Sequence, residues 1–145
     1  MRNPAVEALD VLVGDWQLTL SDAWFLESRE VRQHGHATAR WLGEAFVELE
    51  AELEGMPTWH FLFGRSDPQN QLFTLYHDPR PTSRLYRTTF ADGEWVMLRE
   101  DPDMQQRFVG TVTADRIDGH WDASEDGGVT WRKDFDLTFE RKTAG

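Results

Sequence analysis

The chain has 145 residues and no cysteine, and its 26 acidic against 15 basic side chains give a formal net charge of −11. This length fits one compact unit, so we expect a single domain over residues 1–145. The negative charge argues against nucleic-acid and membrane partners and favours a small ligand. Disulfides and thiolate metal sites are excluded. Because neither a signal peptide nor a membrane-spanning stretch is recognisable, we expect a cytoplasmic protein.

The first residues predict a short helix that leads into a strand. Asn3 is a favoured N-cap residue and Pro4 a favoured first helical residue, and Val6 and Leu9 follow at helical spacing. Gly14 is placed to end the helix. The apolar residues that then alternate with polar ones, as in a strand, are Trp16, Leu18 and Leu20.

The next two segments give a first indication of a cavity. Residues 21–32 show no clean period but contain Trp24-Phe25-Leu26, so we interpret them as a lid, with an ordinary packed loop as the alternative. In residues 34–42 small side chains alternate with polar ones, among them His34 and His36, which we expect outside. If the small residues face inward, they leave room for a ligand. These small residues are Gly35, Ala37 and Ala39.

Turn signals recur about every dozen residues through the rest of the chain. They lie at 67–70, 78–81, 92–93, 101–103, 118–119 and 126–128. Such spacing predicts an antiparallel meander. Together with the Trp-containing first strand and the alternating final segment 131–141, it predicts an all-β fold: a closed antiparallel up-and-down β-barrel whose first and last strands meet, with a short N-terminal helix.

Turn chemistry also predicts which residues face each other across the strands. The Asp92-Gly93 pair is a strong signal for a two-residue hairpin loop. It places Phe90 opposite Trp95, Thr88 opposite Met97 and Tyr86 opposite Arg99. Centring the 67–70 turn places Phe61 opposite Tyr76 and His60 opposite His77. Centring the 78–83 turn places Tyr76 opposite Tyr86 and Asp78 opposite Arg84.

These pairings separate the central strands into two faces. We assign the aromatic face to the interior, although a register slip of one residue would exchange the faces. It contains Trp59, Phe61, Phe63, Tyr76, Asp78, Arg84, Tyr86, Phe90, Trp95, Met97 and Arg99. The other face then carries an apolar outer patch of Leu62, Leu75, Leu85 and Leu98. Because such patches often mark subunit interfaces, we predict a homodimer.

Short motifs along nearly the whole chain resemble those of the calycin barrels, and within them the short bacterial nitrobindin-like and lipocalin-like proteins. The motifs are Leu12-Val13-Gly14-Asp15-Trp16, Tyr76-His77-Asp78, Arg84-Leu85-Tyr86, Gln106-Arg107-Phe108, Gly119-His120-Trp121 and the segment 124–131. The resemblance implies a barrel of about ten strands with a small-molecule cavity. It implies no definite reaction.

Two features of these families bear on the ligand. Nitrobindins hold a haem through a histidine late in the barrel, whereas here the late strands offer only His120 and the closing segment 131–141 has none. We therefore expect no haem, no other cofactor and no metal. Fatty-acid-binding relatives clamp a carboxylate with an interior arginine and an Arg-x-Tyr pair, to which Arg84-Leu85-Tyr86 with Arg99 is similar.

The predicted function is binding of a small hydrophobic or aromatic molecule that has a polar or anionic end. Arginines outnumber Asp78 on the inner face, and this surplus positive charge suits an anionic group held by planar bidentate contacts. A purely structural account pairs Asp78 with Arg84 and Tyr86 with Arg99. The predicted ligand-binding residues are Arg84, Tyr86, Arg99, Tyr76, Phe61, Phe63, Trp95, Met97 and Trp41.

Two alternatives involve titratable side chains. In the first, Asp78 beside Tyr76 has a raised pKa and moves a proton, as in an isomerase or cyclase. In the second, which we favour less, the barrel binds haem through His60, His77 or His120. Facing each other, His60 and His77 also resemble a metal or acid-base pair, but no third ligand is near in sequence, so we expect solvated or interface histidines.

Overall fold

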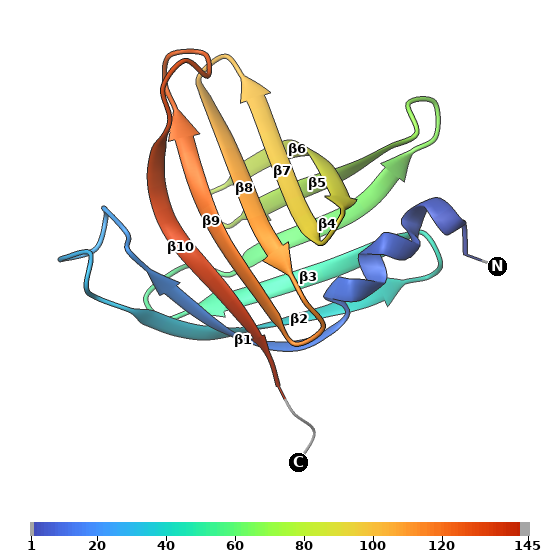
Figure 1. Cartoon of the computed structure of the whole chain (residues 1–145), viewed down its shortest axis with the longest axis horizontal. Helices are drawn as coiled ribbons and strands as arrows, with labels where there is room; N and C mark the ends of the chain where they lie inside the picture. Colours follow the sequence, from blue (N-terminus) through green and yellow to red (C-terminus); the bar gives the residue numbers. More distant parts are fainter. Residues whose placement is uncertain (1, 143–145) are drawn as a thin grey trace.

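The computed structural model, which describes residues 2–142, is a closed barrel of ten antiparallel strands. Each strand pairs with its neighbours in sequence, and β1 pairs with β10 to close the sheet (Figure 1). The elements are the helix η1 (Pro4–Leu12) and the strands β1 (Gly14–Ser21), β2 (Gln33–Leu42), β3 (Phe46–Leu53), β4 (Trp59–Ser66), β5 (Gln71–Asp78), β6 (Thr82–Ala91), β7 (Glu94–Asp101), β8 (Met104–Val112), β9 (Arg116–Ser124) and β10 (Arg132–Arg141). The predicted closed all-β barrel with a short N-terminal helix is confirmed.

The helix η1 covers one end of the barrel. It is a 3₁₀ helix that packs against β3 and β4, and the Asn3 side chain accepts a hydrogen bond from the Ala5 amide at 2.9 Å, as expected of an N-cap. Two residues of the helix itself, Leu9 and Leu12, are fully buried. The Trp16 indole donates to the Leu12 carbonyl at 2.8 Å, so the end of the helix is fixed to the first strand.

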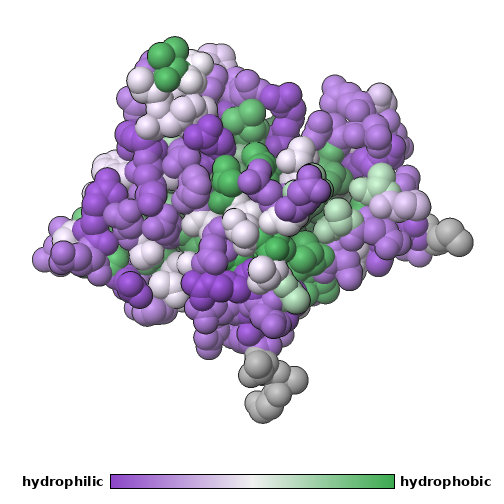
Figure 2. Space-filling view, viewed as in Figure 1, coloured by the Kyte–Doolittle hydropathy of each residue, from purple (hydrophilic) through white to green (hydrophobic). Residues whose placement is uncertain are grey.

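An up-and-down barrel places alternate loops at opposite ends. The loops that follow β1, β3, β5, β7 and β9 form one end, and η1 lies at the other end with the loops that follow β2, β4, β6 and β8 (Figure 1). The visible face of the molecule is mostly hydrophilic, in keeping with its net charge of −11 (Figure 2). In the described residues no helix is long and apolar enough to cross a membrane.

Most of the predicted cross-strand pairs are present. Phe90 pairs with Trp95 and Thr88 with Met97 across the Asp92-Gly93 turn, where both turn residues have positive φ. Phe61 pairs with Tyr76, and His60 with His77. The turn types fix these registers. The expected pairing of Tyr86 with Arg99 lies beyond the last pair of its ladder, Arg87 with Leu98.

The register across the turn between β5 and β6 differs from the prediction. Tyr76 pairs with Arg84 instead of Tyr86, and Asp78 pairs with Thr82 instead of Arg84. The turn consists only of residues 79–81, so it is shorter than the centred turn that the prediction assumed. Because side chains alternate with a period of two, this shift of two residues leaves every side chain on its predicted face.

The aromatic face is the interior, as predicted. Its members with nearly complete burial include Phe63, Trp95 and Met97, whereas Leu85 on the opposite face is 62% exposed. On the outside, Leu62 pairs with Leu75 and Leu75 with Leu85, so three of the four patch leucines form a continuous stripe. A homodimer through this stripe stays a prediction.

The small-residue wall on β2 does not line a cavity inside the barrel, in contrast to the expectation. Ala37 and Ala39 are buried, but neither lines the main cavity described below. Gly35 lies so close to β3 that a Cβ atom there would be 1.9 Å from the Glu52 carbonyl oxygen. Trp16 is fully buried directly opposite Ala37, so small residues on β2 provide room for a core side chain.

Candidate functional site

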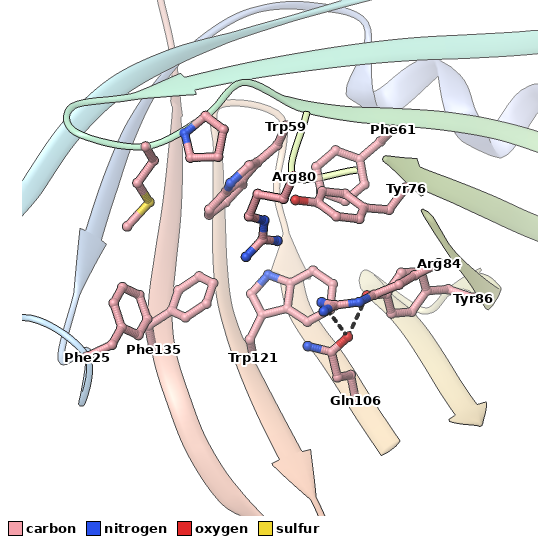
Figure 3. A pocket seen from close by; sticks show the side chains of 12 residues that line it. Phe25, Trp59, Phe61, Tyr76, Arg80, Arg84, Tyr86, Gln106, Trp121 and Phe135 are labelled. Atoms are coloured by element: carbon pink, nitrogen blue, oxygen red, sulfur yellow. Dashed lines mark hydrogen bonds between the residues drawn. The ribbon is translucent and has the colours of Figure 1, made fainter. Parts of the chain in front are cut away.

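A cavity of about 330 Å³ opens at the end of the barrel opposite η1 (Figure 3). Its rim includes Phe25, Pro57 and Arg80 from the loops after β1, β3 and β5. The volume is at the lower end of the range for small-molecule sites, about 300–1,000 Å³. The complete lining is Phe25, Met56, Pro57, Trp59, Phe61, Tyr76, Arg80, Arg84, Tyr86, Gln106, Trp121 and Phe135.

Aromatic rings form most of the wall. Trp59 lies 6.0 Å from Phe135 between ring centroids, and Phe135 lies 5.7 Å from Phe25 at the rim. On the other side, Tyr86 contacts Trp121 edge to face at 5.5 Å. Apart from Phe25 in the loop after β1, these side chains alternate inward along β4, β6, β9 and β10, so strands far apart in sequence supply one surface. Such a wall favours a flat apolar ligand.

One polar group interrupts this aromatic wall, and we call it the polar platform: Arg84, Tyr86 and Gln106. Gln106 Oε1 accepts hydrogen bonds from Arg84 Nη1 at 3.2 Å and from the Tyr86 hydroxyl at 2.8 Å (Figure 3). Since a guanidinium group only donates, the amide oxygen must face Arg84. The amide nitrogen of Gln106 therefore remains as a donor that is not used by Arg84 or Tyr86.

The polar platform carries a positive charge that is not neutralised. Arg84 is half-buried, and within the described part of the chain no carboxylate lies within ion-pair distance of it; its hydrogen bond is to Gln106. Burial raises the pKa of Tyr86 to about 12, so its hydroxyl is neutral and protonated at physiological pH. The platform thus offers donors and one positive charge, an arrangement that suits an anion or a strong acceptor.

A second polar group, at the cavity rim, is internally neutralised. The Asp78 carboxylate accepts hydrogen bonds from Arg80 Nε at 2.9 Å to each of its oxygens, from the Arg80 backbone amide at 2.9 Å, and from the Tyr76 hydroxyl. Tyr76 and Arg80 line the cavity, but Asp78 does not. The predicted Asp78–Arg84 ion pair is therefore wrong. In the shorter turn, Arg80 is the ion-pair partner of Asp78.

The expected raised pKa of Asp78 is also wrong. Hydrogen bonds from Arg80 hold the pKa of this carboxyl well below its usual range, and they outweigh the opposing effect of burial. Burial, with the hydrogen bond to Asp78, raises the pKa of the Tyr76 hydroxyl far above neutral pH. Neither group is poised to exchange a proton near pH 7, so the geometry does not favour the acid-base alternative.

Arg99 does not contribute to the cavity, although the sequence placed it there. It donates to the Asp103 carboxylate at 2.9 Å and to the Met104 carbonyl at 2.7 Å, and its Nε lies 3.0 Å from Asp101. These partners lie in or beside the turn between β7 and β8, which Arg99 therefore stabilises. The expected hydrogen bond between Arg99 and Tyr86 is absent from the described residues, since Tyr86 donates to Gln106 instead.

Four of the other predicted ligand-binding residues lie elsewhere. Phe63, Trp95 and Met97 are buried deeper in the barrel and do not line the main cavity. Trp41 lies near the closed end, where its indole donates to Asp10 of η1 at 2.9 Å. The remaining predicted residues, Phe61, Tyr76, Arg84 and Tyr86, do line the cavity.

Several lining residues were absent from the predicted site. Gln106 pairs with Arg99 and alternates with the inward-facing Phe108 on β8, and Trp121 on β9 pairs with Phe108. Extending the predicted pairings beyond the 101–103 turn would have found both residues. Arg80 had only a turn signal, because its side chain folds back from a loop over the barrel rim. Strand periodicity does not predict where the side chain of a turn residue such as Arg80 lies.

The five histidines all lie outside this cavity. His60 and His77 stack on the outer face with ring centroids 4.7 Å apart and planes inclined by 6°. His120 lies on the outer side of β9, with Nδ1 3.3 Å from Asp122. Among residues 2–142 no three His, Asp or Glu side chains are grouped to hold a metal ion. The cavity offers no imidazole to a haem iron.

Comparisons with known proteins support the fold. No protein-family model matches the chain, and no curated protein sequence matches it. Among solved structures, the crystal structure of Rv2717c from M. tuberculosis is similar, with a TM-score of 0.69 and 10% sequence identity over 99% of this chain and 100% of that one. A redesigned β-barrel has a TM-score of 0.46 at 13% identity, covering 94% of this chain and 96% of its own. The chain therefore shares a ten-stranded barrel fold with Rv2717c.

Proposed function

We propose that the cavity binds a small hydrophobic or aromatic molecule whose anionic or acceptor end lies on the polar platform. Arg84 carries this proposal. It is a half-buried cation in an aromatic cavity whose hydrogen bond is to a neutral amide, Gln106, while the neighbouring cation Arg80 is already neutralised by Asp78. A carboxylate at the platform would complete the hydrogen bonding of Arg84 and of the Gln106 amide nitrogen.

The aromatic wall supplies the affinity and the platform supplies the orientation. Burial of an apolar group contributes about 0.8 kcal/mol for each CH₂, so a ten-carbon ligand gains about 5 to 8 kcal/mol before the cost of association. A micromolar dissociation constant therefore requires no covalent or metal chemistry. The single charged contact then discriminates acids from neutral analogues.

Two further observations are in keeping with this proposal. The barrel is closed at the η1 end and open at the other, as a container for a small ligand would be. The motifs that resemble nitrobindin-like and lipocalin-like barrels lead to the same class of function. Within that class we favour a carboxylate ligand over haem, because the cavity wall is built without histidine.

The test is a displacement assay with 8-anilinonaphthalene-1-sulfonate, in which 2-naphthoate competes against its methyl ester. We expect micromolar binding of the acid by the wild-type protein. Arg84→Gln should weaken the acid about tenfold or more, since hydrogen bonds to charged groups contribute about 1.5–3 kcal/mol, and should leave the ester nearly unchanged.

The matched control is Arg87→Gln, which removes a guanidinium from the same strand on its outer face, where Arg87 pairs with Glu100. This variant should bind both competitors as the wild type does. Equal losses for acid and ester in Arg84→Gln would contradict the proposed role of the platform. Failure of the wild-type protein to bind the fluorescent probe would contradict ligand binding itself.

A further inference from the structure

Arg80 reaches the cavity as a cation whose charge is already neutralised. Its Nε lies 2.9 Å from each oxygen of the buried Asp78 carboxylate, and its Nη2 donates to one of these oxygens. The Arg80 side chain lines the cavity, whereas Asp78 does not. In contrast to Arg84, Arg80 therefore does not need an anionic ligand as a partner.

The contacts with Asp78 fix the orientation of the Arg80 guanidinium. Two nitrogens on one edge of this planar group bind the two oxygens of one carboxylate, an arrangement in which the carboxylate lies near the guanidinium plane. The Arg80 backbone amide donates to the same carboxylate at 2.9 Å, so both ends of the residue are held. With this edge occupied, Arg80 can offer a ligand the flat face of its guanidinium, which is the surface that stacks on aromatic rings.

Figure 3 shows Arg80 extending from the rim towards the indole rings of Trp59 and Trp121, which line the same cavity. Stacking of a guanidinium on an indole recurs elsewhere in this barrel, at 3.5–5.2 Å between the guanidinium carbon and the ring centroid. Among residues 2–142, Arg80 is not one of the stacked arginines. The face of its guanidinium stays available to a ring that a ligand supplies. The stacked pairs are Arg2 with Trp41, Arg107 with Trp131, Arg132 with Trp24 and Arg141 with Trp16.

Arg80 also lies close to the polar platform. Tyr76 connects the two, because its hydroxyl donates to the Asp78 carboxylate that holds Arg80, and its backbone pairs with Arg84 on β6. Tyr76, Arg80 and Arg84 all line the cavity. A ligand whose carboxylate contacts Arg84 therefore brings the ring that carries this carboxylate to the guanidinium of Arg80.

We propose, building on the ligand-binding function above, that the Arg80 guanidinium stacks on the ring of the bound ligand and selects an aromatic acid over an aliphatic acid of the same size. The face of an aromatic ring carries partial negative charge, which attracts a guanidinium placed over it. A saturated ring has no such face. The ligand class is thus a carboxylate attached to an electron-rich aromatic ring.

This arrangement makes Arg80 a specificity-determining residue and Asp78 the residue that positions it. Asp78 fixes the guanidinium before the ligand arrives, so little side-chain freedom is lost on binding. Arg84 distinguishes acids from esters, whereas Arg80 distinguishes electron-rich from electron-poor rings. A contact between a cation and an aromatic face changes affinity about threefold or more.

The first experiment compares 2-naphthoate with heptafluoro-2-naphthoate in the displacement assay. Fluorine keeps the flat ring system but withdraws electrons from its faces, so the contact with a cation is weakened. Because replacing Arg80 alone would leave the buried Asp78 carboxylate without its partner, the variant is Asp78→Asn/Arg80→Met. The ratio of the two dissociation constants should shift about threefold or more in favour of the fluorinated acid from wild type to this variant.

Comparing the two proteins removes other effects of fluorine, because its influence on the carboxylate is common to both. The matched control is Arg65→Met/Asp67→Asn, which removes the same two charged groups from an ion pair that does not line the cavity. This variant should keep the wild-type ratio.

The second experiment observes Arg80 directly in the wild-type protein, so it does not depend on the folding of Asp78→Asn/Arg80→Met. The Arg80 Nε–H group donates to a buried carboxylate, which slows its exchange with water, and its ¹H–¹⁵N NMR signal is assigned by its loss in Arg80→Lys. Since a proton over an aromatic ring is shifted upfield, bound 2-naphthoate should move this signal upfield. The Nε–H signal of Arg116, which donates to Asp118 at 2.9 Å away from the cavity, should stay in place.

The outcomes separate this inference from the proposed function. If 2-naphthoate displaces the fluorescent probe but the Arg80 signal does not move upfield, this inference is wrong and the proposed function stands. The same conclusion follows if Asp78→Asn/Arg80→Met keeps the wild-type preference between the two acids. If neither acid binds the wild-type protein, both proposals fail.

Discussion

Asp78 and Arg80 form an ion pair in which the carboxylate side chain is 0% exposed and the guanidinium side chain is 55% exposed. Only Pro79 separates them, and Pro79 and Pro81 restrict the backbone of the turn that holds them. The buried carboxylate thus positions a cation at the cavity rim without reaching the cavity itself. Asp78 is a positioning residue in this geometry.

Replacing Asp78 should release Arg80 and loosen this turn. Asp78→Asn keeps an acceptor for Tyr76 but removes the charge that holds the guanidinium, so we expect a loss of about 1–3 kcal/mol in the free energy of unfolding. Urea denaturation followed by tryptophan fluorescence measures it. The control is Asp67→Asn, which removes the charge that pairs with Arg65. Because the Asp67 side chain is 86% exposed, this variant should change the free energy of unfolding by less than about 1 kcal/mol. An Asp78→Asn variant with an unchanged free energy of unfolding would contradict the structural role assigned to this pair.

The same carboxylate predicts a pH dependence of stability. The hydrogen bonds from Arg80 lower the pKa of Asp78 in the folded state below its unfolded value of about 3.9. The folded state therefore binds fewer protons than the unfolded state, and Asp78 stabilises it fully above that unfolded value. This contribution should disappear as the pH falls from about 4 towards the folded-state pKa. The difference in unfolding free energy between wild type and Asp78→Asn should accordingly shrink in acid; a constant difference between pH 7 and pH 2 would refute the lowered pKa.

The charge of the polar platform can be changed with little change in shape. Gln106→Glu places a carboxylate beside Arg84, where it neutralises the guanidinium and repels an anionic ligand. We expect binding of 2-naphthoate to weaken about tenfold or more while binding of its methyl ester changes little. Isothermal titration with both ligands provides the comparison. Gln105→Glu on the same strand is the control, since Gln105 does not line the cavity. Tighter binding of the acid by Gln106→Glu would show that the polar platform is not the anion site.

The closed end of the barrel should contribute stability rather than binding. Leu9 of η1 is fully buried, so Leu9→Ala should lower the free energy of unfolding by about 2–5 kcal/mol through lost burial and a new void. Because the main cavity opens at the opposite end, the affinity for 2-naphthoate should be unchanged where the variant is folded. Thermal denaturation and the displacement assay test the two parts separately. A selective loss of ligand affinity would show that the two ends are coupled.

The fold could be predicted because its determinants are local. The Asp92-Gly93 turn sets a hairpin register by its backbone conformation, and alternation then assigns Phe90, Trp95 and Met97 to the interior. Across the 79–81 turn the register differs from the prediction by two residues. Because side chains alternate with a period of two, each residue still lies on its predicted face.

The site was only partly predictable because its polar contacts are made by side chains of residues in turns and at the ends of strands. Arg84 was assigned to Asp78 by counting along the strands, but Arg80 is nearer in space because its side chain folds back from the turn. Arg99 was assigned to the interior correctly, but its guanidinium forms ion pairs with Asp101 and Asp103 at the end of its own hairpin instead of facing the cavity. Alternation gives the face of a residue and not its partner.

The pairing of β1 with β10 also has a kinetic consequence. Trp16 is paired with Arg141, whose guanidinium donates to the carbonyls of Val13 at 2.7 Å and Val11 at 3.0 Å. The contacts that close the sheet therefore join segments that are distant in the chain, and such contacts slow folding because a long loop must be ordered first. During synthesis, β1 leaves the ribosome long before its partner exists. We therefore expect the barrel to close only after β10 has been translated, with the two unpaired strand edges exposed to chaperones or to aggregation until then.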